Sequence, residues 1–321
     1  MPLVRRAPFV AFYVTAWLIA LAVMGAYYVI GLVWDPSVFA LLDDMARWIA
    51  TGHSYTNIVA IARYAVHSGR PATWLIFVYA AAPSIAALVV TLRVAGREGV
   101  RALLTRYRPW NGGVTAAQAA PWYLALLAGH LALTGAYLWV AYAFAPREAF
   151  AEAWQTAGGS VPAAIGISVL GLFVDEGGTL EELGWRGFGL PRLLDRLKSP
   201  LGASVALGLL WAAWHMPELI PYALGHPTGA WMTTIARFFV MCAADTVIMT
   251  FFYFRTGGSV LPAIMIHASW NFRSKAFGAA VTQVLGTEPR FWIVVGVAAV
   301  IVVLTGPRLG QPRGVARGED L

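Results

Sequence analysis

The chain has 321 residues, of which 59% are hydrophobic and only 12% charged, about half the charged share of an ordinary soluble domain. With a mean hydropathy of +0.65, the composition excludes a water-soluble globular protein and indicates a chain whose solvent is lipid. The net charge of +7 does not indicate a nucleic-acid partner, because the arginines cluster at the ends of apolar segments, where they orient membrane proteins. The single cysteine, Cys242, excludes an intrachain disulfide.

Eight apolar segments come near the length of about 20 residues that a helix needs to cross a bilayer. They lie at residues 9–33, 73–95, 121–145, 161–189, 201–223, 231–254, 259–277 and 289–305. Most arginines between the segments fall on one side if both termini are cytoplasmic. We therefore expect an all-α, polytopic bundle of about eight transmembrane helices in the plasma membrane of a bacterium or archaeon, with both termini cytoplasmic.

The remaining stretches divide the chain without suggesting a second domain. Residues 34–72 carry apolar residues at helical spacing among charged ones, which predicts amphipathic helices at the outer interface. Residues 306–321 are rich in Gly, Pro and Arg, which predicts a disordered tail. We expect one integral membrane domain, with N-terminal helices and the amphipathic segment in 1–150, a core of helices in 151–305 and the tail in 306–321.

Two adjacent glutamates, Glu181 and Glu182, lie within an apolar segment, where carboxylates are rare and usually functional. Neighbouring side chains on a helix point about 100° apart, so the two cannot face one cavity equally. Glu182 and Arg186 stand four residues apart and can form an ion pair, which leaves Glu181 to act as a general base. Alternatively, both glutamates lie at a hydrated helix end and balance arginines. The nearby Asp175 and Glu176 are expected to be supporting or structural.

His215 lies in the next apolar segment, two residues before Pro217. The proline lacks an N–H and should kink the helix just after His215, which can open a polar pocket. The histidine then holds a water molecule or a metal ion, or it is a core histidine bonded to a backbone carbonyl. A hairpin turn at Lys198 would bring His215 and Glu181 to equal depth, although Pro191 is expected to end or kink the first helix.

His267 and Asn271 lie four residues apart in a third segment and therefore share one helix face. An imidazole and a carboxamide can both donate hydrogen bonds to an oxyanion. The alternative is a pair that holds two helices of the bundle together. Asp245, in the segment 231–254, is expected to be structural, with Thr246 and Thr250 as its hydrogen-bond partners.

Several other sites are excluded by the motifs that the chain lacks. There is no His-Glu-x-x-His helix of zinc proteases, no P-loop and no dinucleotide fingerprint. Ser204 is followed by Val205 rather than by the glycine of a rhomboid-type serine motif, and no Gly-x-Gly-Asp of the presenilin kind is present.

Three motifs occur in a fixed order within residues 160–275. They are Glu181-Glu182…Arg186, Trp211…His215 and His267…Asn271. Together they resemble the pattern of the CAAX protease and bacteriocin-processing (CPBP) family, also called Abi, which includes the type 2 CAAX prenyl proteases. Trp211 stands where phenylalanine is common in that family, and residues 1–150 carry no recognisable motif.

The resemblance implies an intramembrane endopeptidase that acts on membrane proteins or lipidated peptides from within a polar cavity of the bundle. In the family mechanism, Glu181 and His215 would activate water, while His267 and Asn271 would hold the oxyanion. Glu182 and Arg186 would orient the site. The resemblance implies either a prenylated CAAX substrate or a bacterial peptide, and it does not choose between them.

The use of a metal is a separate open alternative. Glu181, His215 and His267 could bind zinc with one position open for water, or the glutamate and histidine could work without a metal.

Two other functions stay open at this stage. The first is a catalytically silent scaffold or a bacteriocin-immunity protein, although such a protein would not need both histidines and Asn271. The second is a proton-coupled transporter whose glutamates relay protons. Such transporters often have related halves, and the sequence shows no internal repeat.

Overall fold

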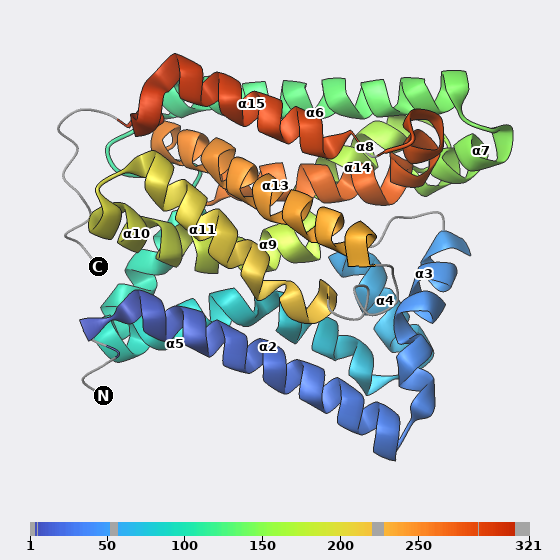
Figure 1. Cartoon of the computed structure of the whole chain (residues 1–321), viewed down its shortest axis with the longest axis horizontal. Coiled ribbons are helices and arrows are strands. Elements are labelled where there is room, and N and C mark those ends of the chain that lie inside the picture. Colours follow the sequence, from blue (N-terminus) through green and yellow to red (C-terminus); the bar gives the residue numbers. More distant parts are fainter. Residues whose placement is uncertain (1–3, 5, 52–56, 220–227, 288, 312–321) are drawn as a thin grey trace.

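The computed structural model describes residues 4, 6–51, 57–219, 228–287 and 289–311, and every regular element within these ranges is helical. Figure 1 shows the long helices side by side and roughly aligned, with α2 packed on α5 and α11 on α13. The predicted polytopic helical bundle is confirmed. The long helices are α2 (Pro8–Val33), α5 (Leu75–Leu104), α6 (Ala116–Phe144), α13 (Thr228–Arg255), α14 (Leu261–Leu285) and α15 (Arg290–Thr305).

Among the described residues, six stretches are long and apolar enough to cross a membrane. They are Pro8–Val33, Pro71–Tyr107, Ala116–Phe144, Val161–Leu197, Gly229–Arg255 and Arg290–Arg308. The predicted segment 201–223 corresponds to α11 (Pro200–Trp214), which has only 15 residues. The predicted segment 259–277 lies in α14, which is longer but carries Arg273, Lys275 and other polar side chains. The predicted count of eight requires that these two helices also cross the membrane, and this stays a prediction.

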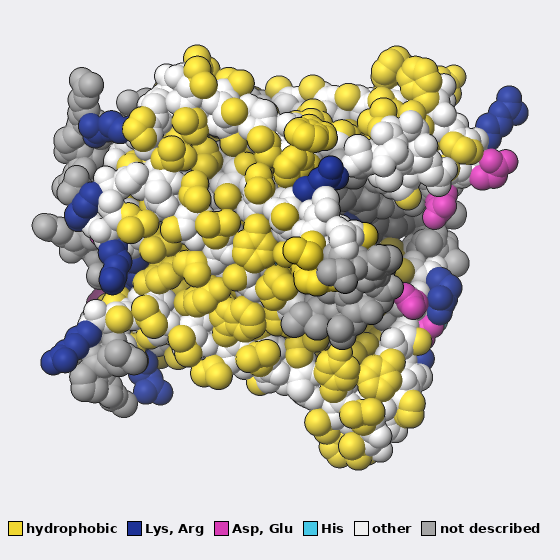
Figure 2. All heavy atoms as spheres, in the orientation of Figure 1, with side chains coloured by type: hydrophobic (Ala, Val, Ile, Leu, Met, Phe, Trp, Pro, Cys, Tyr) yellow, Lys and Arg dark blue, Asp and Glu magenta, His cyan; other side chains and the backbone are white. Residues whose placement is uncertain are grey.

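The outer surface of the bundle is suited to lipid. Figure 2 shows hydrophobic side chains along the flanks of the helices, and Leu18 and Val303 are 61% and 83% exposed. Lys and Arg side chains gather at the end where α2 begins, on the left of the view. The last turns of the elements that end there supply Arg101, Arg106, Arg196, Arg255 and Arg308. This distribution agrees with the predicted clustering of arginines on one side of the membrane.

Two amphipathic helices occupy the connection between α2 and α5, as the sequence predicts. They are α3 (Leu41–Thr51) and α4 (Ile58–Ser68), and their apolar sides pack around Leu41 and Ile61. The Asp44 carboxylate accepts hydrogen bonds from Arg47 at 2.7 Å and from Arg70 at 2.8 Å. These bonds, chiefly the one from Arg70, hold the pKa of Asp44 below its usual value because they stabilise the charged form.

The C-terminal segment is only partly as predicted. Residues Gly306–Arg308 form the short helix η5, and the carbonyl oxygen of Gly310 accepts a hydrogen bond of 2.7 Å from Arg255. This part of the predicted disordered tail therefore packs against the end of α13. Residues 312–321 lie outside the described residues.

The site region is a run of short helices between α8 (Val161–Val174) and α11. These are α9 (Glu176–Glu182), the π-helical segment η4 (Leu183–Gly189) and α10 (Leu190–Leu197). Pro191 lies in the first turn of α10, where a proline is well tolerated because that N–H has no helical partner. The π-helical segment η4 ends at Gly189 and α10 begins at Leu190, so the helical geometry changes near Leu190, as expected.

The predicted hairpin follows directly. Lys198 adopts a left-handed conformation with φ 54°, and the Ser199 hydroxyl accepts a hydrogen bond of 3.1 Å from Gly202 N–H at the start of α11. Gly184 of η4 lies against the backbone of Pro83 in α5, where a β-carbon would overlap it. The turn packs α10 on α11, and the close approach of Gly184 holds η4 against α5.

Candidate active site

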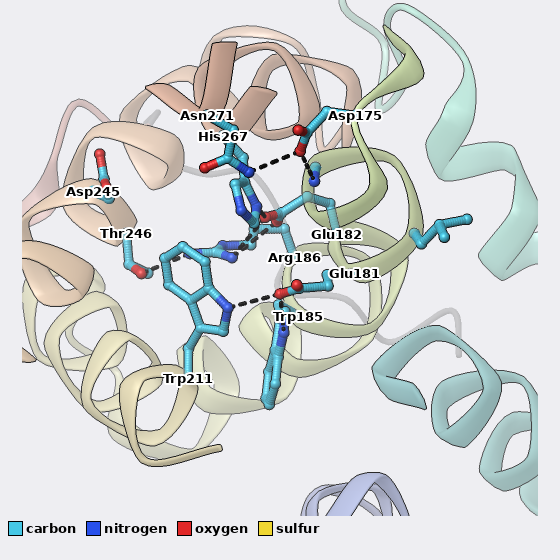
Figure 3. Close-up of polar contacts among 12 residues, drawn as sticks. Asp175, Glu181, Glu182, Trp185, Arg186, Trp211, Asp245, Thr246, His267 and Asn271 are labelled. Atoms are coloured by element: carbon cyan, nitrogen blue, oxygen red, sulfur yellow. Dashed lines mark hydrogen bonds and ion pairs between the residues drawn. The ribbon is translucent and has the colours of Figure 1, made fainter. Parts of the chain in front are cut away.

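Glu181 lies in the last turn of α9 and is only 4% exposed. Its Oε2 atom accepts hydrogen bonds from the indole N–H of Trp211 at 2.8 Å and of Trp185 at 3.3 Å (Figure 3). A buried carboxylate persists only where hydrogen bonds replace those it loses from water. The two indoles satisfy one oxygen and leave Oε1 directed at His215.

His215 follows the end of α11 and presents its two ring nitrogens to different partners. Nδ1 lies 3.0 Å from the carbonyl oxygen of Trp211. A carbonyl only accepts, so this contact assigns the proton to Nδ1 and leaves Nε2 as an acceptor in the neutral ring. Nε2 lies 4.0 Å from Oε1 of Glu181, which is too long for a direct hydrogen bond but leaves room for a bridging water. His215 therefore bonds to a backbone carbonyl through one ring nitrogen and faces Glu181 with the other, so the two alternatives given for it are compatible.

The predicted ion pair between Glu182 and Arg186 is confirmed. The Arg186 Nη1 atom lies 3.0 and 2.9 Å from the two oxygens of Glu182, and both side chains are fully buried. Nη2 donates to the hydroxyl of Thr246 at 2.7 Å, and the guanidinium lies 4.3 Å from the centre of a Trp211 ring. The arginine thus ties η4 to both α11 and α13.

His267 and Asn271 both reach back from α14 to the segment around α9. His267 Nδ1 lies 2.9 Å from Oε1 of Glu182, so His267 pairs with Glu182. Asn271 donates from Nδ2 to Oδ2 of Asp175 at 2.9 Å (Figure 3). The shared face predicted for His267 and Asn271 is therefore turned toward the glutamate-bearing segment.

Gly177 allows this close approach. A β-carbon built on it would stand 2.8 Å from Nε2 of His267 and 3.3 Å from Nδ2 of Asn271. These separations are shorter than ordinary contacts, so any larger residue would displace one of the two side chains. The absence of a β-carbon at Gly177 therefore lets both side chains lie against α9.

The predicted site residues all lie around α9: His215 faces Glu181, Arg186 and His267 bond to Glu182, and Asn271 bonds to Asp175. Sequence reasoning missed three hydrogen-bond partners: Trp185 and Trp211 on Glu181, and Asp175 on Asn271. The two indoles follow a helical spacing that could have revealed them, since Trp185 stands four residues after Glu181 and Trp211 four before His215. No local signal links Asp175 to Asn271, which are far apart in the chain.

The predicted hydrogen-bond partners of Asp245, Thr246 and Thr250, are wrong. Its carboxylate lies 3.2 Å from Nη2 of Arg290, at the start of α15. The hydroxyls of Thr246 and Thr250 instead donate to backbone carbonyls one turn earlier.

The predicted zinc set does not assemble. Within the described ranges, no group of three His, Cys, Asp or Glu side chains could hold a metal ion. In this arrangement, Nδ1 of His267 bonds to Glu182, and its ring packs edge-on against Trp211 at 5.1 Å. Glu181 and His215 face each other, and among the described residues His267 is not grouped with them as a third ligand.

The segment that carries these residues is similar to a known protein family. Residues 159–273 match the family model described as type II CAAX prenyl endopeptidase Rce1-like. This segment is an Rce1-like domain. The match spans all three motifs, and it confirms the family that they predict. No curated protein matched the chain. At the level of the family, the Rce1-like domain is that of a CAAX-type intramembrane protease.

Proposed function

We propose that the protein is an intramembrane endopeptidase in which Glu181 and His215 activate a water molecule. The observation that carries this proposal is the 4.0 Å separation between Oε1 of Glu181 and Nε2 of His215. One carboxylate oxygen is held by two indoles, so the other faces the histidine in a fixed direction. A general base needs this kind of placement, within one water of the proton that it removes.

The proposed reaction begins with water between these two groups. The water oxygen attacks the carbonyl carbon of the peptide bond, and one of its protons passes to Glu181. Nε2 of His215 accepts a hydrogen bond from the other water hydrogen and so fixes the direction of attack. The tetrahedral intermediate then loses the amine when the C–N bond breaks, and the proton on Glu181 passes to that amine.

His267 and Asn271 are the proposed donors to the oxyanion, since Nε2 and Nδ2 converge beside Gly177. Because Nδ1 of His267 bonds to Glu182, Nε2 carries a hydrogen in only two protonation states of this pair. Either an imidazolium faces the carboxylate, or a neutral ring accepts a hydrogen bond from a protonated Glu182. Both states hold the same number of protons, and loss of one proton converts Nε2 into an acceptor. Glu182 and Arg186 then act by holding the ring in place.

The proposed substrates are membrane-associated proteins, with prenylated CAAX peptides as the first to test because the domain is Rce1-like. We place the arginine-rich end of the bundle at the cytoplasmic face of a bacterial or archaeal plasma membrane, with both termini on that side. This orientation follows the excess of positive residues in cytoplasmic segments.

The test is cleavage of a farnesylated CAAX peptide by purified protein in liposomes. Glu181→Gln keeps the size and hydrogen-bonding shape of the side chain but removes the base, so we expect the rate to fall about 10²- to 10⁴-fold. Glu98→Gln is the matched control, because the Glu98 side chain is 81% exposed, and this variant should cleave normally. Cleavage by Glu181→Gln at the wild-type rate would refute the proposal.

A further inference from the structure

Asp175 is a fully buried carboxylate for which the proposed reaction has no direct use. Its Oδ2 atom accepts hydrogen bonds from the backbone N–H of Gly178 at 2.7 Å and from Nδ2 of Asn271 at 2.9 Å. Its Oδ1 atom lies 3.3 Å from Nζ of Lys275. The residue thus caps the first turn of α9 and binds the side chain of Asn271 at the same time.

The contact with Asn271 determines which end of the carboxamide enters the site. An amide side chain has two orientations of nearly equal shape, one with oxygen and one with nitrogen in a given position. An ionised carboxylate only accepts, so the amide nitrogen must face Asp175. That nitrogen has a second hydrogen, and it is the atom that lies near Gly177. The opposite orientation would turn the amide oxygen toward a developing oxyanion, which repels it.

Lys275 keeps Asp175 in the form that imposes this orientation. It stands one turn after Asn271 on α14, and its Nζ atom also lies 2.5 Å from Oε1 of Glu176. A cation near Oδ1 favours the ionised carboxylate. A protonated Asp175 could donate to the amide oxygen and so lose its selectivity.

We propose that Asp175 is a positioning residue, which orients Asn271 so that its nitrogen, and not its oxygen, faces the substrate carbonyl. This inference rests on the proposed function and adds to it a residue outside the three motifs. Asp175 acts through Asn271 and does not touch the reacting atoms.

The test is a double-mutant cycle on peptide cleavage in liposomes, with Asp175→Ser, Asn271→Ala and their combination. Serine is a good helix N-cap, so Asp175→Ser keeps the cap of α9 but is too short to hold Asn271. We expect kcat to fall about 10- to 100-fold with little change in KM, a loss up to that of one oxyanion donor. In the Asn271→Ala background, the same change should have no further effect.

Two outcomes of the cycle would overturn the inference. The first is that Asp175→Ser leaves kcat unchanged. The second is that Asp175→Ser lowers kcat by the same factor with and without Asn271. Either result would indicate that the role of Asp175 is purely structural. Asp43→Ser, the same substitution at an exposed position, is the control and should cleave normally.

A second readout does not depend on proteolysis. The chain has only three asparagines, Asn57, Asn111 and Asn271, so protein labelled with ¹⁵N-asparagine gives three side-chain amide nitrogen signals, each with a pair of hydrogens. Asn271→Ala assigns one of them, and Asp175→Ser should shift that signal while leaving the other two in place. An unshifted Asn271 signal would overturn the inference, even if the wild-type protein cleaves no CAAX peptide and the proposed function fails.

Discussion

Glu181 and Glu182 are neighbours in sequence with different partners in the structure. Glu181 faces two indoles and His215, whereas Glu182 bonds to Arg186 and His267. The helix explains the division, since adjacent residues point about 100° apart. One carboxylate can therefore meet water and substrate while the other holds a histidine in place.

Arg186→Ala tests the supporting role of the ion pair. The substitution leaves Glu182 fully buried without its arginine, and breaking a buried pair in this way typically costs about 3–5 kcal/mol. We expect a clearly lower midpoint in thermal unfolding of the detergent-solubilised protein. Arg101→Ala removes an exposed arginine from the pair with Glu98 and should change little, so equal stability of the two variants would contradict this account.

Gly177→Ala tests the close approach of α9 to α14. The new β-carbon would displace His267 or Asn271, so we expect kcat to fall about 100-fold, as for a lost oxyanion donor. The fold should persist, because alanine favours a helix by about 1 kcal/mol over glycine. Gly166→Ala is the control, since nothing lies within 4 Å of that position. Unchanged cleavage by Gly177→Ala would contradict the placement of the two donors.

The pH dependence of cleavage should be bell-shaped. Glu181 must be ionised to take a proton, so the rate falls as acid protonates it. The pair of Glu182 and His267 must keep the proton that makes Nε2 a donor, so the rate also falls as alkali removes it. Measuring kcat in liposomes across the range from pH 5 to 10 checks both limbs, and a rate that rises steadily with pH would refute the role given to His267.

Chelation tests the metal alternative. Glu181, His215 and His267 are not grouped as ligands in this structure, so we expect cleavage to continue after dialysis against a strong zinc chelator. Loss of activity that returns when zinc is added back would show that the three residues come together in the working enzyme.

At the scale of elements, the π-helical segment η4 follows directly after the glutamates. π-helical turns are rare and often occur at functional sites. The segment places Arg186 on Glu182 while Gly184 packs on the backbone of α5. This arrangement could not be predicted from apolar periodicity, which assumes a regular α-helix through residues 161–189.

Gly184→Ala tests whether this contact positions η4. Its β-carbon would overlap the backbone of Pro83, and a backbone cannot rotate away as a side chain can. We expect α5 to be pushed off η4, with strongly reduced accumulation of folded protein in the membrane. Fluorescence-detected size exclusion of a tagged variant measures this, with Gly166→Ala as control, and normal accumulation would contradict the packing described.

At the scale of the whole molecule, the bundle and its family could be predicted from the sequence. Apolar length predicts the helices, and the three motifs predict the Rce1-like domain. The pairing within the site could not be predicted in full, because it depends on how far each helix is rotated about its own axis. That rotation brings His267 to Glu182, and Asp245 to Arg290 rather than to threonines.

The orientation of the bundle is tested with engineered cysteines. Cys242 is buried, so the wild-type protein gives little background. We expect Arg97→Cys, at the arginine-rich end, to react with a membrane-impermeant maleimide only after the cells are permeabilised. Glu148→Cys, on α7 (Arg147–Thr156) at the opposite end (Figure 1), should react in intact cells. The reverse pattern would place the termini outside.

The central claim is that water, activated by Glu181, attacks the peptide bond directly. It is tested most directly by a single turnover of excess enzyme on a farnesylated CAAX peptide in H₂¹⁸O, followed by mass spectrometry of both product and protein. The account predicts one ¹⁸O atom in the new carboxyl terminus of the product and none in the protein. Incorporation of ¹⁸O into the Glu181 side chain would show a covalent acyl-enzyme instead, and a wild-type protein that forms no product would contradict the proposed activity.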